Sequence, residues 1–184
     1  MCKMIISAGR NEIFDFALPM GMGLVDMSIN LTKFLCENRQ SLPSEIIFVG
    51  SAGLYKEGEI LKIYESRSAV NYEISALYGL SYSPINYEII ARDSTDVSYE
   101  TITNSSNFIT TDKKSALKFF ERGYFLENME FFAVLKVAQK FEIPAYGIFC
   151  ATNFCDSNAH ADFLKNHAAA KENLTKYLKT KALI

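Results

Sequence analysis

The chain has few of the residues from which metal centres and disulfide frameworks are built. Its 184 residues include two histidines, and its four cysteines form no Cys-x-x-Cys pair and no spacing typical of zinc ligands. We therefore expect no metal site. Cys150 lies in an apolar strand pattern and Cys155 in the loop that follows it. Both are interpreted as small, buried, reduced residues.

Long hydrophobic runs and an excess of one charge are also lacking. No apolar run approaches the roughly 20 residues that a membrane-spanning helix needs. The apolar stretch at Met4–Ile6 is too short for a signal peptide, so we expect a cytoplasmic protein. The formal net charge of −2 gives no general electrostatic reason to bind nucleic acid or an anionic membrane, and neither is expected as a partner.

What is present is an ordinary globular composition, with 49% hydrophobic and 22% charged residues. A chain of this length can bury a sizeable core. No internal repeat, low-complexity segment or linker interrupts it. We therefore expect one domain over residues 1–184.

Short apolar runs alternate with amphipathic patterns along the chain, and we interpret them as strands and helices. The expected strands are Met4–Ile6, Ile46–Val49, Ile60–Tyr64 and Tyr146–Ala151, and the expected helices run from Leu24 to about Asn38, from Thr110 or Thr111 to Phe120, from Glu127 to Phe141 and from Ala161 to about Lys181. Residues 66–98 show little periodicity, and we expect only short strands and loops there. The run Ile46–Val49 suits a strand buried on both faces. This alternation favours an α/β fold with a mainly parallel sheet.

Polar clusters stand beside the expected carboxyl ends of the strands. A glycine-rich turn, Gly50–Gly53, follows one strand, and the cluster Thr152–Asp156 follows another. Glu127 and Glu130 open the helix before that second strand. In an open α/β sheet, ligands bind in the crevice outside the carboxyl ends of the strands. The sequence therefore predicts a ligand site made from these groups.

The order of these motifs resembles the purine nucleoside phosphorylase and nucleosidase superfamily. Met129-Glu130 matches the Met-Glu core of its ribose motif, and Gly21-Met22-Gly23 matches its Gly-Ile-Gly before the first long helix. The resemblance extends from Met4 to the C-terminal helix. It implies a three-layer α/β fold with a central mixed, mainly parallel sheet, and a homodimer or larger homo-oligomer. It also implies an enzyme that cleaves the N-glycosidic bond of a purine ribonucleoside and needs no cofactor.

The resemblance assigns the sugar to Met129 and Glu130, and stacking on the base to Phe108. One carboxylate can accept hydrogen bonds from two vicinal hydroxyls, and methionine offers a polarisable apolar surface. The residues alone leave a second interpretation open. In it, Glu130 only complements a helix dipole, while Met129 and Phe108 fill the core.

Asn153 stands where the family has an aspartate that donates toward the purine. A carboxamide cannot act as a general acid, but it can donate through its NH2 and accept through its carbonyl. Asn153 is therefore expected to bind N7 and O6 of a 6-oxopurine, which favours guanosine or inosine over adenosine. A plain turn residue after a strand is the alternative. Asn128 likewise replaces a family glutamate.

Two sets of residues compete for the place beside the nucleophile. In the phosphorolytic branch of the family, Gly9, Arg10 and Ser51 would hold inorganic phosphate. In the hydrolytic branch, Glu12 would activate a water molecule. Phosphorylases of the family also carry an arginine where this chain has Phe48, and this difference favours hydrolysis.

The favoured interpretation is a purine nucleoside phosphorylase of nucleoside salvage, with phosphate as co-substrate. It depends on Arg10, Ser51 and Asn153. The alternatives are a hydrolytic nucleosidase that uses Glu12, a catalytically impaired purine-binding protein, and an unrelated α/β ligand-binding domain. Arg10 and Glu12 can equally be a solvated pair of loop charges.

Overall fold

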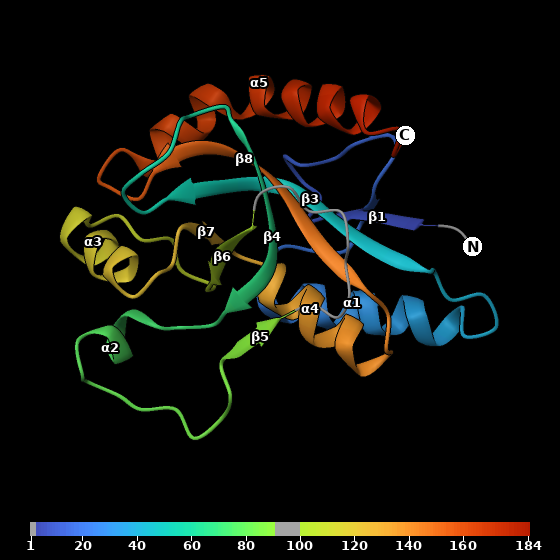
Figure 1. Cartoon of the computed structure of the whole chain (residues 1–184), viewed down its shortest axis with the longest axis horizontal. Helices are drawn as coiled ribbons and strands as arrows, with labels where there is room; N and C mark the ends of the chain where they lie inside the picture. The colour runs from blue at the N-terminus through green and yellow to red at the C-terminus, as the bar shows by residue number, and fades with distance from the viewer. Residues whose placement is uncertain (1–2, 91–99) are drawn as a thin grey trace.

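The structure of the protein is a computed structural model that describes residues 3–90 and 100–184. These residues form a mixed sheet of eight strands between layers of helices (Figure 1). The strands are β1 (Lys3–Ser7), β2 (Leu18–Pro19), β3 (Glu45–Leu54), β4 (Ile63–Val70), β5 (Glu88–Ile90), β6 (Glu100–Ser105), β7 (Leu126–Asn128) and β8 (Ala145–Phe154). The helices are α1 (Gly23–Glu37), α2 (Ile74–Leu77), α3 (Lys113–Glu121), α4 (Phe131–Lys140) and α5 (Ala159–Thr180). Of the segment 66–98, residues 91–98 lie outside the described residues.

The sheet is mixed and mainly parallel, as expected. Its order is β2-β1-β3-β7-β6-β4-β5, and β8 pairs with both β3 and β4. The pairings β1–β2, β1–β3, β3–β8, β4–β6 and β6–β7 are parallel. The pairings β3–β7, β4–β5 and β4–β8 are antiparallel. The predicted α/β class is therefore confirmed.

Helices cover both faces of the sheet. In Figure 1, α5 lies over one face, and α1 and α4 lie under the other. Ile46 and Phe48 of β3 belong to the cluster on the side of α1 and α4, while Ile47 and Val49 belong to the cluster on the side of α5. Because successive side chains of a strand point to opposite faces, the continuous apolar run of β3 is buried on both. This prediction is confirmed.

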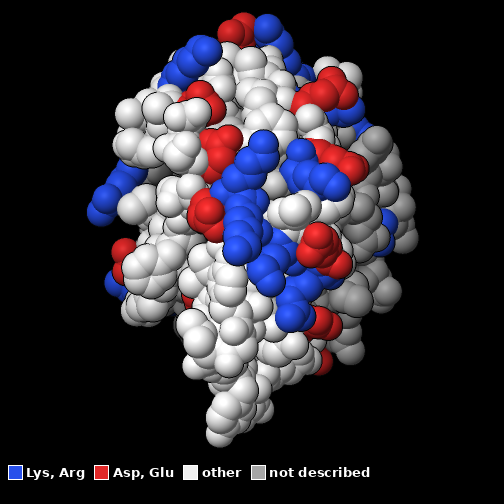
Figure 2. Space-filling view, turned by 90° about the vertical axis from the view of Figure 1, so that its left-hand side faces the viewer, with Lys and Arg blue, Asp and Glu red and all other residues white. Residues whose placement is uncertain are grey.

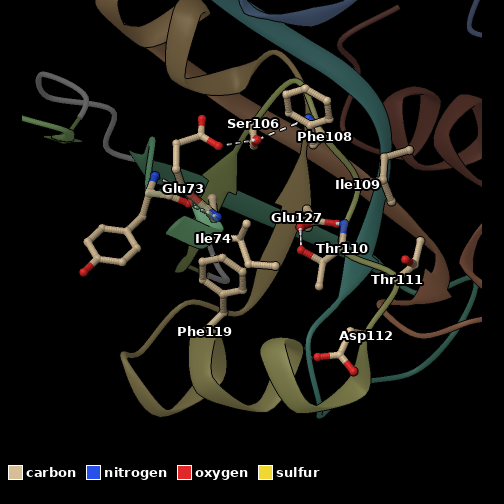
Figure 3. A pocket seen from close by; sticks show the side chains of 12 residues that line it. Glu73, Ile74, Ser106, Phe108, Ile109, Thr110, Thr111, Asp112, Phe119 and Glu127 are labelled. Carbon is tan, nitrogen blue, oxygen red and sulfur yellow. Dashed lines mark hydrogen bonds between the residues drawn. The ribbon is translucent and has the colours of Figure 1, made fainter. Parts of the chain in front are cut away.

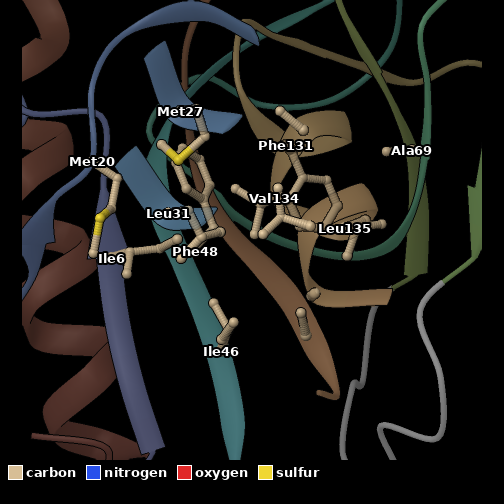
Figure 4. Close-up of a cluster of buried hydrophobic side chains, with 14 of the residues drawn as sticks. Ile6, Met20, Met27, Leu31, Ile46, Phe48, Ala69, Phe131, Val134 and Leu135 are labelled. Atoms are coloured by element: carbon tan, nitrogen blue, oxygen red, sulfur yellow. The ribbon is translucent and has the colours of Figure 1, made fainter. Parts of the chain in front are cut away.

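The larger hydrophobic cluster joins α1 and α4 to the sheet (Figure 4). Met27 and Leu31 of α1 are fully buried, and they are four residues apart, on one face of the helix. Phe131 of α4 contacts Phe48 and Phe149 of the sheet, with ring centroids 6.2 and 5.3 Å apart. This packing fixes the start of α4, where the candidate site begins.

Two strands run further than predicted. β3 continues through Gly50 to Leu54, and β8 continues to Phe154. The two strands pair in parallel along their length, with an irregularity after Ala52. The glycine-rich segment expected to be a turn is therefore strand, and that prediction is wrong. Backbone pairing with a buried neighbour extends each strand beyond its apolar run.

Three other boundaries are corrected. The helix expected from Glu127 begins only at Phe131, and Glu127 lies in β7, which pairs with β3 and β6. α3 is capped by Asp112, whose side chain accepts from the Ser115 N–H (2.8 Å), and not by a threonine. The strand expected from Ile60 begins at residue 63.

No helix in the described residues is long and apolar enough to cross a membrane. Figure 2 shows the side of the molecule on which α3 lies, where Lys and Arg side chains form a band with Asp and Glu on both sides. α3 itself contains Lys113, Lys114, Lys118 and Glu121. Because both signs are interspersed, this face presents no uniform positive field.

Gly147 of β8 is expected to be essential for the packing of the aromatic cluster. A Cβ at this position would lie 2.5 Å from the ring of Phe149 and 2.9 Å from that of Phe131. Gly147→Ala should therefore lower the free energy of unfolding by roughly 1–3 kcal/mol through overpacking. Urea denaturation measures this. The double variant Gly147→Ala/Phe149→Leu should lose less than the sum of its single changes, and an unchanged midpoint for Gly147→Ala would contradict the packing.

Candidate active site

A glutamate from the turn after β1 lies against the end of β3. This turn is closed by a hydrogen bond from the Glu12 N–H to the Gly9 carbonyl (2.9 Å). Oε1 of Glu12 accepts from the Ser51 N–H at 2.7 Å and also from the Ser51 hydroxyl. A Cβ on Gly50 would lie 2.8 Å from Oε2 of Glu12. The carboxylate fits here because Gly50 has no side chain.

Glu130 is the second carboxylate of this region. It directly precedes α4, is 3% exposed, and accepts through Oε1 from the N–H of Gly23 at the start of α1 (2.8 Å). Burial and, after it, the negative charge of Glu12 raise the pKa of Glu130 to about 7. The negative charges of the two carboxylates therefore influence each other.

Burial also raises the pKa of Glu12, and the hydrogen bonds from Ser51 oppose this effect. A carboxylate with a raised pKa is a stronger base than a solvated one, and perturbed groups of this kind cluster at functional sites. The pair Glu12 and Glu130 can thus supply a proton acceptor and a second group that accepts hydrogen bonds.

Asn128 joins the two halves of this arrangement. Its Oδ1 accepts from the N–H groups of Glu130 (2.7 Å) and Phe131 (2.8 Å), and its Nδ2 donates to the Ser51 carbonyl (3.3 Å). It therefore binds the first N–H group of α4, that of Phe131, and ties the start of that helix to β3. Where the family has a glutamate, this chain has a residue that supports the backbone around Glu130 and Ser51.

Asn153 lies in β8 beside Gly53 of β3, and is 7% exposed. Its Oδ1 accepts from the Thr152 hydroxyl (2.9 Å), and its Nδ2 donates to the Phe154 carbonyl (3.1 Å). A Cβ on Gly53 would lie 3.0 Å from Nδ2 of Asn153. The glycine therefore leaves room for the amide on this part of the sheet.

Phe108 lies in the loop between β6 and α3, and its side chain is 80% exposed. The preceding residue, Asn107, accepts through Oδ1 from the N–H of Leu24 (2.9 Å). The neighbouring N–H, that of Gly23, donates to Glu130. The N-terminus of α1 thus brings the loop of Phe108 next to the carboxylate assigned to ribose.

The remaining predicted site residues are Met129, Gly9 and Arg10. Met129 lies between Asn128 and Glu130 and is partly buried. Gly9 and Arg10 form the turn after β1, with positive φ angles of 90° and 54°, and the Arg10 side chain is exposed. The role of each in binding stays a prediction.

The sequence matches no protein-family model and no curated protein. Solved structures match it along nearly its whole length. A futalosine hydrolase mutant from Helicobacter pylori strain 26695 has a TM-score of 0.79 at 17% identity, covering 97% of each chain. A 5′-methylthioadenosine/S-adenosylhomocysteine nucleosidase from Helicobacter pylori has a TM-score of 0.78 at 17% identity, covering 98% of this chain and 97% of that one. The same nucleosidase from S. pneumoniae has a TM-score of 0.75 at 13% identity, covering 97% of this chain and 96% of that one.

The chain has the nucleoside phosphorylase/nucleosidase fold. The fold implied by Met129-Glu130 and the other motifs is therefore confirmed. Within this fold, the structure brings Glu12, Ser51 and Glu130 together and places the loop of Phe108 beside them.

Two contributors to this part of the fold were missed in the sequence. Asn128 was noted only as a departure from the family, and its contacts with the N–H groups of Glu130 and Phe131 were not predicted. Asn107, which holds its loop to α1, carries no local signal, because its partner Leu24 is distant in the chain.

The Glu130 carboxylate is expected to destabilise the fold at neutral pH. Its pKa of about 7 in the folded protein lies above the ordinary value of 4.5, so the folded state binds more protons between these pH values. Stability therefore falls as pH rises through this window. Glu130→Gln, which retains an acceptor for the Gly23 N–H, should raise the free energy of unfolding at pH 8 by up to about 3 kcal/mol.

Urea denaturation at pH 4 and pH 8 measures this difference, which should nearly vanish at pH 4. Glu121→Gln, an exposed carboxylate on α3, serves as the control and should change little at either pH. If the Glu130→Gln protein were less stable than the natural chain at pH 8, the ionised carboxylate of Glu130 would not be destabilising the folded state.

Proposed function

We propose that this protein is a nucleosidase that hydrolyses the N-glycosidic bond of a purine ribonucleoside. The contact between Glu12 and Ser51 carries the proposal. The N–H and hydroxyl of Ser51 are the donors that would hold phosphate in a phosphorylase, and Glu12 accepts from both. With Glu130 nearby, two carboxylates occupy this place, and they would repel an anion.

Two further observations support hydrolysis over the phosphorolysis that the sequence favoured. The similar structures include nucleosidases and a futalosine hydrolase. Phe48, which stands where phosphorylases carry an arginine, is fully buried among Phe131 and Phe149 and adds no positive charge. Phosphate is therefore not part of the proposed reaction.

In this reaction, water attacks C1′ of the ribose as the bond from C1′ to N9 of the purine breaks. Glu12 in its ionised form takes the proton of the water through Oε2, the oxygen that lies over Gly50. The electron pair of the broken bond leaves with the base, which finally receives that proton. Glu130 accepts hydrogen bonds from the ribose hydroxyls, and Met129 contacts the sugar. The products are ribose and the free base.

Asn153 is the residue that we assign to the purine edge, together with stacking by Phe108. Its Oδ1 is used by the Thr152 hydroxyl and one N–H by the Phe154 carbonyl, which leaves the second N–H to donate toward N7 and O6. A donor stabilises the negative charge of the departing base and pairs with a 6-oxo group. We therefore propose inosine or guanosine as the substrate type.

A second copy of the chain is the proposed partner. α1 exposes Val25 and Ile29, which are four residues apart on its outer side, and Met22 directly before the helix is also exposed. Together they form an apolar stripe. The homodimer or larger homo-oligomer expected from the sequence stays a prediction, and this stripe is the surface that supports it.

The reaction type is tested by turnover of inosine and guanosine with and without inorganic phosphate, resolving free base, ribose and ribose 1-phosphate. Futalosine and 5′-methylthioadenosine, which appear in the names of the similar enzymes, are tested as additional substrates. We expect ribose at the same rate without phosphate. Glu12→Gln should lower kcat by roughly 10²–10⁴ because the proton acceptor is lost, while Asp15→Asn, an exposed carboxylate nearby, should not.

Phosphate-dependent release of ribose 1-phosphate would overturn the proposal in favour of a phosphorylase. Tight binding of a purine nucleoside with no turnover would favour the second candidate, a purine-binding protein with impaired catalysis. The observation behind that candidate is Asn153, whose amide cannot give a proton to the leaving base.

The base preference is tested by Asn153→Asp. A carboxylate accepts from the 6-amino group of adenine and, once protonated, donates to N7, so kcat/KM for adenosine relative to inosine should rise. We expect a change of roughly tenfold or more, since one hydrogen bond to a charged group contributes about 1.5–3 kcal/mol. The ratio is measured on both nucleosides under identical conditions, and an unchanged ratio would remove Asn153 from the recognition of the base.

A further inference from the structure

A buried carboxylate on β7 takes no part in the proposed reaction. Glu127 is 5% exposed and accepts from four donors. Its Oε1 accepts from the hydroxyls of Thr110 (2.5 Å) and Tyr55 (3.1 Å), and its Oε2 accepts from the Thr110 N–H (2.9 Å) and the Cys155 thiol (3.5 Å). The end of β3, the loop before α3 and the loop after β8 therefore converge on one side chain.

Two of these donors belong to the loop that presents Phe108. We call residues 106–111 the base loop. Phe108 and Ile109 are 80% and 50% exposed, so burial of its own apolar side chains does not hold the loop in place. The base loop lines a cavity of about 160 Å³, whose other walls include Ile74 and Phe119 (Figure 3).

Polar contacts at both ends hold the base loop instead. Near its start, Ser106 donates through its hydroxyl to Glu73 (3.2 Å) and accepts from the Phe108 N–H (3.2 Å). At its end, Thr110 donates twice to Glu127. Figure 3 shows both anchors on either side of Phe108 and Ile109.

The position of Glu127 is itself fixed by the strands around it. Tyr55, which donates to Glu127, accepts from Nδ2 of Asn104 on β6 (2.9 Å). Burial, followed by the charge of Glu127, raises the pKa of the Tyr55 phenol well above its usual value, so Tyr55 remains a donor. The carboxylate is thus a rigid acceptor for the end of the base loop.

We infer that Glu127 is a positioning residue that sets the affinity for the purine base by holding Thr110, and through it Phe108, without touching the base or the reacting atoms. The inference rests on the proposed function, because it requires that the purine stacks on Phe108. A carboxylate suits this role, since its two oxygens accept separately from the N–H and the hydroxyl of Thr110. Glutamine would offer only one such oxygen.

Thr110→Val tests the inference with little change in shape, because it removes only the hydroxyl. We expect the Kd for free hypoxanthine, measured by calorimetry, and the KM for inosine to rise roughly tenfold, while kcat stays within about twofold. Thr180→Val is the control, because Thr180 is an exposed threonine at the end of α5, outside the base loop, and this variant is expected to behave as the natural chain. Glu127→Gln should likewise raise KM with little change in kcat, and Glu127→Leu should raise KM further.

A double-mutant cycle separates positioning from a merely structural role. In a Phe108→Ala background, Thr110→Val should no longer weaken hypoxanthine binding, because the ring that the base loop presents is absent. Additive losses, or losses that parallel a fall in thermal stability and in kcat, would overturn the inference. So would unchanged hypoxanthine affinity in Thr110→Val and Glu127→Leu proteins that remain folded. If the natural chain neither binds nor cleaves any purine nucleoside, the proposed function itself fails.

Discussion

The candidate site depends on holding acidic side chains inside the protein with backbone N–H groups. Burying a carboxylate is costly unless hydrogen bonds compensate it. Glu12 is held by the N–H and hydroxyl of Ser51, and Glu130 by the first N–H of α1. The first N–H groups of a helix have no partner within it and favour negative charge. The end of a strand and the start of a helix therefore create a place that accepts carboxylates and disfavours added anions.

Much of the fold follows from local patterns in the sequence. The continuous apolar run at Ile46–Val49 indicates a strand covered on both faces, and the helical spacing of Met27, Leu31 and Leu35 indicates one buried stripe on α1. The ends of β3 and β8 did not follow, because Gly50, Ser51 and Asn153 are not strand-forming residues by themselves. Their pairing with a buried neighbour is a tertiary effect.

Candidate site residues could be named from the sequence where a residue type is tied to a motif, as with Glu130 and Asn153, whose roles stay predictions. Contacts between residues that are far apart in the chain could not be predicted in this way. β7 was taken for the first turn of a helix, because a strand of three residues gives no periodic signal. For the same reason Glu127 was assigned to a helix start. Its donors lie at positions 55, 110 and 155, and only the folded sheet brings them together.

The start of α1 gives the two halves of the candidate site a common reference. The N–H of Gly23 fixes Glu130, and the next N–H, that of Leu24, fixes Asn107 in the base loop. Successive Cα atoms are about 3.8 Å apart, so the residues that bind Glu130 and Asn107 are separated by a single peptide unit. A planar peptide unit therefore links the start of α4 to the base loop. A lateral displacement of α1 would therefore disturb both hydrogen bonds together, that of Glu130 and that of Asn107.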